Sequence, residues 1–484
     1  MLALTLLLFF ASVNWIYSSL ELPPSTIDCV GVQATSRRCY FHDVLVVQGV
    51  IWFISEVEIQ IPSILCSAVD HDRETYCNII LINSSSAIRK LEEFYGDGFN
   101  AIIDVDTGLA FGRVNPTNLY HTLFEDTAPI HQMLKHDAKL SEWLSPSPKV
   151  SSIVVFQDFR WQYHFEFSYS FWTRFFPTTK FVVLPHPNAS DDKLFEQSFK
   201  AYRVKYLVAG SNNSCAHYFH CTGGGYTDPN AVTDFRQFLL DKVGIEPRDS
   251  HDQRVPKVLI VQRGSTRRIR NIIQLVDLIT KIHGTQPRVQ DLQKLCIDDQ
   301  IKLVHDADIV IMIHGGAVGH MLFMASHASL FEFYPYSWPY EYHGLVNWVR
   351  HSMIDIPIRH HTFDIRDPRH MYYRGKRLGL CVCDTSTRSL WYNCGVRLYY
   401  LLGQFEVEIH RFQEHFSIAL KHWEMRRPIE PPMDKSTFKN FTLRMKEPVY
   451  YPYVRYLYSK SAASKRNGSE VPDCFPMVYN LVIL

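Results

Sequence analysis

The stretch from Asp308 to Pro335, DIVIMIHGGAVGHMLFMASHASLFEFYP, constrains the fold of this chain more than any other. It reads as an apolar strand, a glycine-rich turn, a short helix and a second apolar strand. Chains of this design bind an anion at the helix N-terminus, because unpaired backbone N–H groups and the helix dipole both favour negative charge there. The sequence therefore predicts an α/β unit whose first candidate ligand is a nucleotide.

Strands and helices alternate on both sides of this stretch. In the C-terminal half, strands are expected at 257–262, 288–292, 308–314 and 329–335, and helices at 271–283 and 298–307. In the N-terminal half, segments long enough for crossover helices separate apolar runs at 152–157, 181–185 and 204–209. Such alternation predicts parallel sheets that are covered on both faces.

The length of 484 residues and a hydrophobic content of 46% allow two domains. A polar break at 246–256 separates the two halves. We therefore predict an α/β fold of GT-B type, with two Rossmann-like domains facing a central cleft. The expected divisions are an N-terminal leader at 1–20, an α/β domain at 21–250, a Rossmann-like nucleotide-binding domain at 251–395, helices packing back across both domains at 396–424 and a tail at 425–484.

The charge balance excludes some classes of partner. Lys and Arg number 50 against 49 Asp and Glu, so the chain has no net field to hold nucleic acid or an anionic membrane surface. We expect no nucleic-acid partner, and we expect specificity to come from a local site.

The N-terminal residues 2–20, LALTLLLFFASVNWIYSSL, are apolar enough to engage the secretory pathway. They fit a cleaved signal peptide, which the small residues Ser18 and Ser19 suit, or an uncleaved membrane anchor across a thin bilayer. Five N-x-S/T sequons agree with a lumenal location, at Asn83, Asn188, Asn212, Asn440 and Asn467. We expect the protein in the lumen of the endoplasmic reticulum or Golgi, either anchored or soluble.

Eleven cysteines also suit an oxidising compartment. Their spacing suggests short disulfide loops, which would join Cys29 with Cys39, Cys66 with Cys77, and Cys215 with Cys221. The CVC sequence at 381–383 with Cys394 invites a zinc interpretation, but it lacks a second close-spaced pair. We therefore favour disulfides and expect no structural metal.

Arginines follow the predicted strand at 257–262 in the sequence RGSTRRIRN. Arg263 and Arg267 would stand at the carboxyl edge of the sheet, where open α/β sheets bind ligands, and guanidinium groups match diphosphate oxygens. A solvated basic loop is the alternative.

The turn at 314–320, HGGAVGH, supports the same interpretation. Gly315 and Gly316 would let the backbone approach a phosphate, although many turns need glycine for conformation alone. His314 ends the preceding strand. Glu332, near the end of the next strand, is expected to accept hydrogen bonds from ribose hydroxyls.

A second polar group lies in the N-terminal half, in RVNPTNLYHTLFED at 113–126. Helical spacing places Asn118, His121 and Glu125 on one face, a pattern that an ordinary solvent-facing helix also shows. An inverting sugar transfer needs a general base, and the candidates are His121, Glu125 and Asp126. The acidic DVD at 104–106 resembles a metal motif, but acid doublets of this kind are common and we do not predict a metal there.

Together these motifs resemble the family 61 glycosyltransferases. RGSTR…N at 263–271, HGGAVGHMLFM at 314–324 and FEFYP at 331–335 are similar to that family's arginine motif, HGA-type turn and E-x-x-P corner. NLYHTLFED at 118–126 is similar to its N-x-x-H motif with a following acid. The resemblance implies a GT-B fold, a UDP-sugar donor and inversion of configuration.

The resemblance also implies roles for individual residues. The residues expected to contact UDP are Arg263, Arg267, His314, Gly315, Gly316 and Glu332. Arg113, Asn118 and His121 would line the cleft from the other domain. Glu125 stands where similar members have Asp, so the choice of base stays open.

The stretches at 29–41 and 112–129 are similar to members that act on O-linked mannose. This implies transfer of GlcNAc from UDP-GlcNAc to O-mannose on a glycoprotein. Residues 425–484 are too short for the C-terminal fibronectin type III domain of those members, which leaves the acceptor open. The alternatives are transfer of GlcNAc to Ser or Thr of EGF-like domains, transfer of xylose, or a lumenal protein that binds UDP or a glycan without catalysis. The sequence requires no cofactor besides the donor and leaves cation dependence open.

Overall fold

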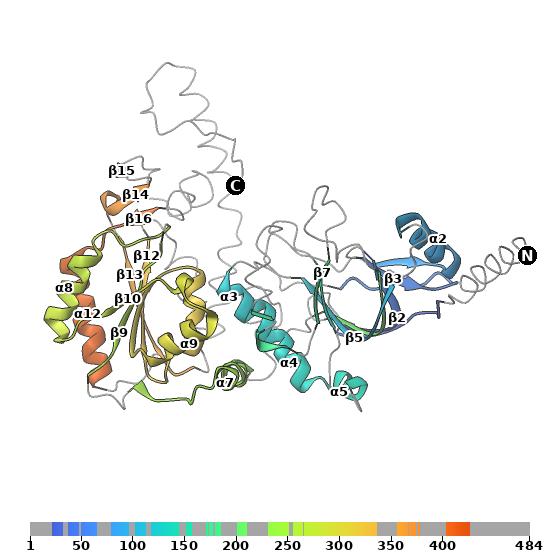
Figure 1. Cartoon of the computed structure of the whole chain (residues 1–484), viewed down its shortest axis with the longest axis horizontal. Coiled ribbons are helices and arrows are strands. Elements are labelled where there is room, and N and C mark those ends of the chain that lie inside the picture. Colours follow the sequence, from blue (N-terminus) through green and yellow to red (C-terminus); the bar gives the residue numbers. More distant parts are fainter. Residues whose placement is uncertain are drawn as a thin grey trace, which may run out of the picture. The chain divides into compact units, whose positions relative to one another are not determined.

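A computed structural model divides the chain into unit 1, Met1–Phe235, and unit 2, Arg236–Leu484 (Figure 1). The division falls inside helix α7 (Ala231–Val243), upstream of the polar break at 246–256. The structure describes residues 22–31, 37–47, 50–64, 79–95, 102–112, 118–144, 152–156, 171–172, 174–177, 180–184, 201–210, 231–250, 255–264, 266–335, 356–365, 367–373, 376–377 and 403–425.

Unit 2 is built on a parallel sheet with the strand order β10-β9-β11-β12-β13. The strands are β9 (Val258–Val261), β10 (Arg288–Gln290), β11 (Ile309–Ile313), β12 (Ser329–Tyr334) and β13 (Arg359–Asp364). The helices are α8 (Ile272–His283), α9 (Ile297–Asp306) and α12 (Ile409–Glu424). Helices α8 and α12 lie on one side of the sheet and α9 on the other (Figure 1). The strands and helices predicted between residues 257 and 335 are thus confirmed.

Side chains on β12 alternate between two buried faces. Phe331 and Phe333 pack into the core beneath α8 and α12, with ring centroids 5.1 and 5.7 Å from that of Phe412. Because successive residues of a strand point to opposite faces, Glu332 and Tyr334 lie on the other face. All six residues of β12 are buried, so a carboxylate here needs polar partners inside the protein.

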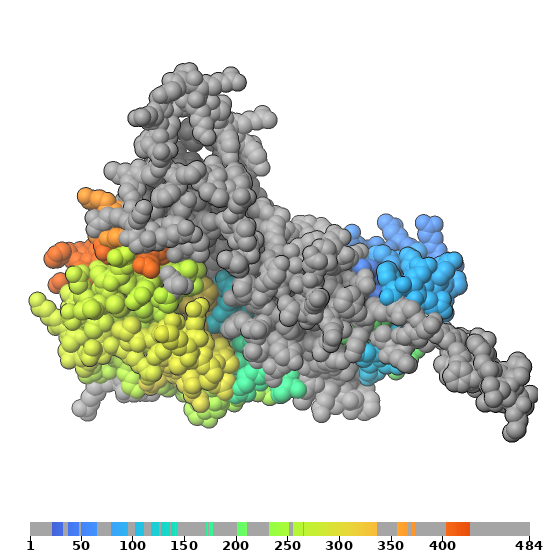
Figure 2. Space-filling model, turned by 45° about the horizontal axis from the view of Figure 1, so that its top comes forward, coloured from blue at the N-terminus to red at the C-terminus, as the bar shows by residue number. Residues whose placement is uncertain are grey.

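The strand order creates a topological switch point in unit 2. The chain leaves β9 through α8 to β10 on one side, and then crosses through α9 to β11 on the other side of β9. The pairing of Ile311 with Ile260 brings the carboxyl ends of β9 and β11 side by side. Open α/β sheets bind ligands in the crevice outside such a point. In the space-filling view, α8, β10 and α9 form one continuous surface on the side of β10, coloured yellow-green to yellow (Figure 2).

Unit 1 contains a mixed sheet with the strand order β4-β3-β2-β8-β5-β6-β7, and β1 pairs with β2. The strands are β1 (Thr26–Val30), β2 (Arg38–Val47), β3 (Val50–Ile54), β4 (Ile79–Ile82), β5 (Ile102–Gly112), β6 (Ser152–Phe156), β7 (Lys180–Leu184) and β8 (Ala201–Ala209). The helices are α2 (Ser84–Tyr95), α3 (Leu119–His121), the π-helix η3 (Thr122–Thr127), α4 (Ala128–His136) and α5 (Ala138–Leu144).

The parallel sheet predicted for this half is present in β8, β5, β6 and β7. The sheet also contains β2, for which no strand direction was predicted and which pairs antiparallel with β8 and β3. Only two residues separate β2 from β3, and so short a connection permits only an antiparallel pair between these two strands. The expected GT-B arrangement concerns how the two units face each other and stays a prediction.

Two features stabilise β2 in unit 1. Cys29 and Cys39 face each other in the β1–β2 pair and form a disulfide, as predicted. Arg38 forms a buried ion pair with Asp137, whose carboxylate also accepts a hydrogen bond from Tyr40 Oη at 2.6 Å. The other two predicted cysteine pairs and the CVC sequence lie outside the described residues.

The segment 396–424, predicted to be helical throughout, is helical only from Ile409 in its described part. Gln404 and Phe405 form the short strand β16, which pairs with β14 (Met371–Tyr373), and β14 pairs with β15 (Lys376–Arg377). Phe405 is fully buried in the core of unit 2, and this packing overrides the helical tendency of the segment.

Candidate functional site

The arginine loop, which we define as residues 262–264 and 266–271, connects β9 to α8 at the switch point. Gln262 closes the loop, since its Nε2 donates to the Ile269 carbonyl at 2.8 Å and its Oε1 accepts from the Ile269 N–H at 3.1 Å. Arg263 Nη2 donates to Thr266 Oγ1 at 3.2 Å. These hydrogen bonds join the described residues of the loop through their own side chains.

Residues 403–407 support the arginine loop from the C-terminal part of unit 2. The N–H of Arg267 donates to the carbonyl of Gly403 at 2.6 Å. The Asn271 side chain donates to the Val407 carbonyl at 2.9 Å and accepts from the Val407 N–H at 2.8 Å. The loop is thus preorganised, which lowers the cost of ordering it around a ligand.

Two arginine side chains of this loop are partly buried and form no ion pair with a described carboxylate. Within the described part of the chain, no carboxylate forms an ion pair with Arg263 or Arg267, and the Nε of each is buried without a hydrogen-bond partner. Burial lowers the pKa of Arg263, against the opposing charge of Asp291. Burial, together with the positive charge of Arg263, lowers the pKa of Arg267 to about 9. A diphosphate would supply the negative charge that these two groups lack.

The glycine turn follows the carboxyl end of β11, beside the arginine loop. Gly315 has φ 142°, a conformation that favours glycine, and a Cβ at this position would overlap the guanidinium of Arg267. Arg267 Nη1 donates to the His314 carbonyl at 2.7 Å. The 3₁₀ helix η7 (Gly316–Phe323) begins immediately afterwards. Gly315 therefore permits the close approach of Arg267, whereas phosphate contact at Gly315 and Gly316 stays a prediction.

Glu332 lies at the centre of a buried polar cluster, which we call the Glu332 cluster. Its Oε1 is 2.6 Å from His314 Nδ1, and its Oε2 is 2.7 Å from His360 Nε2 and accepts from Tyr334 Oη at 2.7 Å. The rings of His314 and Tyr334 stack at 5.0 Å. The side chain of Glu332 has no exposed surface, and that of His360 is 2% exposed.

The environment keeps Glu332 ionised. Burial alone would raise its pKa, but the charge and hydrogen bond of His314, with those of His360, outweigh burial and lower the pKa to about 2. Both carboxylate oxygens are already engaged by side chains. The predicted contact with a ribose stays a prediction, and what the structure supplies is a carboxylate that holds His314.

The motif of the N-terminal half begins at the amino end of α3. Asn118 is the N-cap of α3, and its side chain accepts a hydrogen bond from the Tyr120 N–H at 3.0 Å. His121 ends α3, and Glu125 and Asp126 belong to the π-helix η3. A π-helical turn is rare and frequently marks a functional site. Arg113 lies outside the described residues.

The structure brings Arg263, Arg267, His314 and Glu332 together in unit 2, whereas Asn118, His121, Glu125 and Asp126 belong to unit 1. Sequence reasoning missed His360 and gave no role to Gln262. The available signal was strand alternation, because β13 pairs with β12 in parallel and His360, two residues before Thr362, shares its face. That signal depends on the register, which the sequence does not specify.

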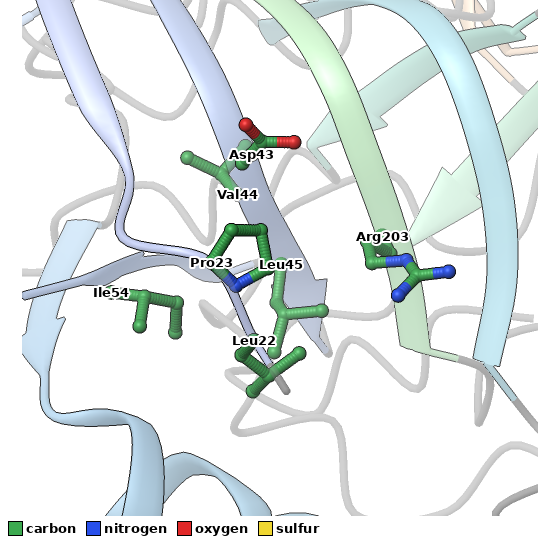
Figure 3. Close-up of a pocket in the computed structure, with 7 residues that line it drawn as sticks. All are labelled: Leu22, Pro23, Asp43, Val44, Leu45, Ile54 and Arg203. Carbon is green, nitrogen blue, oxygen red and sulfur yellow. The ribbon is translucent and has the colours of Figure 1, made fainter. Parts of the chain in front are cut away.

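A small apolar pocket lies elsewhere, in unit 1, where the segment after residue 21 crosses the sheet (Figure 3). None of the predicted ligand contacts lines it. Its lining residues are Leu22, Pro23, Asp43, Val44, Leu45, Ile54 and Arg203. In the described ranges, no group of three His, Cys, Asp or Glu side chains is arranged to hold a metal ion. Nor does any helix in those ranges have the length and apolarity to cross a membrane.

Comparison with known proteins agrees with the geometry of unit 2. The chain is similar to proteins named EGF domain-specific O-linked N-acetylglucosamine transferase, with 26% identity over 117 residues in Xenopus laevis and 29% over 102 residues in Mus musculus. These alignments cover 24% and 21% of this chain, and 21% and 19% of the relatives, so the chain matches about a fifth of the length of its curated relatives.

A family model gives the second finding. Residues 169–331 match the model described as Glycosyltransferase 61, about a third of the chain. The match includes the arginine loop and the glycine turn and ends one residue before Glu332, while Asn118 to Asp126 lie outside it. This part of the chain is therefore similar to the glycosyltransferase 61 family.

Proposed function

We propose that this protein is an inverting glycosyltransferase that uses UDP-GlcNAc and glycosylates Ser or Thr in an EGF-like domain of a glycoprotein. One observation carries the donor part, namely that Arg263 and Arg267, partly buried and without an ion-pair partner among the described residues, lie at the switch point of a parallel sheet. The names of the similar transferases support GlcNAc and the EGF-like acceptor.

The proposed reaction is a single displacement. The oxygen of the acceptor hydroxyl forms a bond to the anomeric carbon of GlcNAc as the bond from that carbon to the diphosphate oxygen breaks. A general base takes the hydroxyl proton, and the candidates remain His121, Glu125 and Asp126. The negative charge that develops on UDP is stabilised by Arg263 and Arg267, which are already positioned before reaction.

A second acceptor, O-linked mannose, is favoured by a separate observation. The stretches at 29–41 and 112–129 lie outside the region matched by the family model and are similar to transferases that act on O-mannose. The alternative activity is therefore that of a protein O-linked-mannose β-1,4-N-acetylglucosaminyltransferase, with O-linked mannose as the acceptor. We further propose that the protein works in the secretory lumen, which the Cys29–Cys39 disulfide supports.

The test is a transfer assay with radiolabelled UDP-GlcNAc against a folded EGF-like module and a mannosyl peptide. We expect label on the EGF-like module. Label on the mannosyl peptide alone would favour the alternative. UDP binding without transfer to either acceptor and without donor hydrolysis would favour a non-catalytic binding protein. UDP-xylose and EDTA in parallel reactions report donor choice and cation dependence.

The base is assigned by three variants in the same assay. We expect one of His121→Ala, Glu125→Gln and Asp126→Asn to lower transfer by about 10²-fold or more while leaving the affinity for UDP unchanged. If all three variants retain full transfer, the base does not lie in this motif.

A further inference from the structure

The Glu332 cluster contains a fully buried, ionised carboxylate, and burying such a group costs free energy. Removing a carboxylate from water costs several kcal/mol, about as much as a good buried ion pair returns, so stability alone does not favour such a residue on an otherwise apolar strand. The flanking Phe331 and Phe333 show that β12 accepts large apolar side chains. The cluster therefore has a purpose other than stability.

Exposure distinguishes the members of this cluster. The side chain of His314 is 15% exposed, whereas that of Glu332 is fully buried and that of His360 is 2% exposed. His314 is also joined to the anion site, because its carbonyl accepts the hydrogen bond from Arg267. His314 is therefore the member through which the cluster reaches the site of the diphosphate.

The geometry fixes the orientation of the His314 ring. Nδ1 and Nε2 lie on opposite sides of an imidazole, so the 2.6 Å contact of Nδ1 with buried Glu332 directs Nε2 away from the core. Tyr334 stacks on the same ring, with the ring centroids 5.0 Å apart.

We propose that Glu332 is a positioning residue, which holds the His314 ring so that it contacts the diphosphate of the nucleotide. This inference rests on the proposed function, because it assumes that a nucleoside diphosphate binds beside Arg263 and Arg267. It assigns Glu332 an indirect role in place of ribose contact. His360 and Tyr334 occupy its second oxygen and keep the carboxylate from moving.

Asp308 provides a matched control in the same unit. It is also a fully buried carboxylate, and it lies just before the amino end of β11, whereas His314 follows the carboxyl end. Its partners are Arg248 Nη1 at 2.9 Å and the Lys257 N–H at 2.7 Å. Asp308→Asn and Glu332→Gln each remove one buried carboxylate and differ in distance from Arg263 and Arg267.

The experiment measures UDP affinity by calorimetry for the full chain and both variants, at a temperature where ligand-free unfolding curves show each to be folded. We expect Glu332→Gln to weaken UDP binding by about tenfold or more, as loss of a charge-assisted hydrogen bond would. Asp308→Asn should bind UDP as the unsubstituted protein does. Equal UDP affinity in all three proteins would overturn the positioning role and leave the proposed function standing. No UDP binding by the unsubstituted protein would overturn both.

Discussion

At the residue scale, two partly buried arginines of unit 2 differ in their partners. Arg248 pairs with the fully buried carboxylate of Asp308 at 2.9 Å. Arg267 has its backbone at φ 51° and donates to a carbonyl, but in the described part of the molecule it has no acidic partner. A buried charge without a partner lowers stability and persists where function requires it. The two arginines should therefore respond differently to the same substitution.

We predict that Arg248→Met destabilises the protein by about 3–5 kcal/mol, because it leaves Asp308 as an uncompensated buried charge. Arg267→Met should change stability by less than about 1 kcal/mol, because the lost hydrogen bond is offset by relief of the buried charge. Urea unfolding measures both effects. Equal destabilisation by the two substitutions would show that Arg267 is an ordinary structural arginine.

The depressed pKa of Glu332 gives a pH prediction. A carboxylate whose pKa is lowered from 4.5 to about 2 by folding adds stability above pH 4.5, and this stability is lost as the pH falls toward 2. Gln at position 332 does not titrate. We therefore expect the difference in unfolding free energy between the unsubstituted protein and Glu332→Gln to shrink between pH 5 and pH 3. A constant difference would mean that Glu332 is not held ionised.

At the element scale, the site depends on short segments that join regular elements. The arginine loop follows β9, the glycine turn follows β11, and residues 403–407 support the loop from far along the chain. In unit 1, α3 and η3 carry the candidate bases and begin at the cap of Asn118. For the side chain of Asn118, capping α3 and contacting a ligand are two separate roles.

We predict that Asn118→Ala destabilises unit 1 by about 1 kcal/mol through loss of the N-cap, while Asn118→Asp retains the stability because both residues cap well. If Asn118 also lines the substrate cleft, Asn118→Asp keeps the fold and lowers transfer. Thermal unfolding and the transfer assay on the two variants separate these roles. Destabilisation of similar size in both variants would refute the capping account.

The elements of unit 2 were predictable because their signals are local. The apolar runs that became β9, β11 and β12, and the helical spacing of α8, needed no information from elsewhere in the chain. Arg263 and Arg267 could be identified because strand ends carry ligand contacts in such sheets. His360 could not, since its contact with Glu332 depends on the register between β12 and β13. The antiparallel pairing of β2 and β8 likewise joins residues far apart in sequence.

At the scale of the whole molecule, the chain combines two units of different construction. Unit 2 has a wholly parallel five-stranded sheet with Arg263 and Arg267 at its switch point, and unit 1 has a mixed sheet. The transfer reaction proposed here assigns donor binding to unit 2 and the proton acceptor to unit 1. Each unit should therefore respond to its own ligand.

We predict that UDP slows amide hydrogen exchange in unit 2, at the arginine loop and at residues 313–318, and leaves α3 and η3 unchanged. The reason is that a ligand raises the stability of the segments whose bound form it favours. Hydrogen-exchange mass spectrometry with and without UDP measures this. Protection confined to unit 1 would contradict the assignment of UDP binding to unit 2.

The central claim is that Arg263 and Arg267 bind the diphosphate of a nucleotide. Calorimetric titration of UDP into the unsubstituted protein, Arg263→Met and Arg267→Met tests it most directly, with uridine as the ligand lacking phosphate. We predict that UDP binds the unsubstituted protein, that each variant loses about tenfold or more in affinity, and that uridine binds weakly and equally to all three. Equal UDP affinity in the three proteins would contradict the claim.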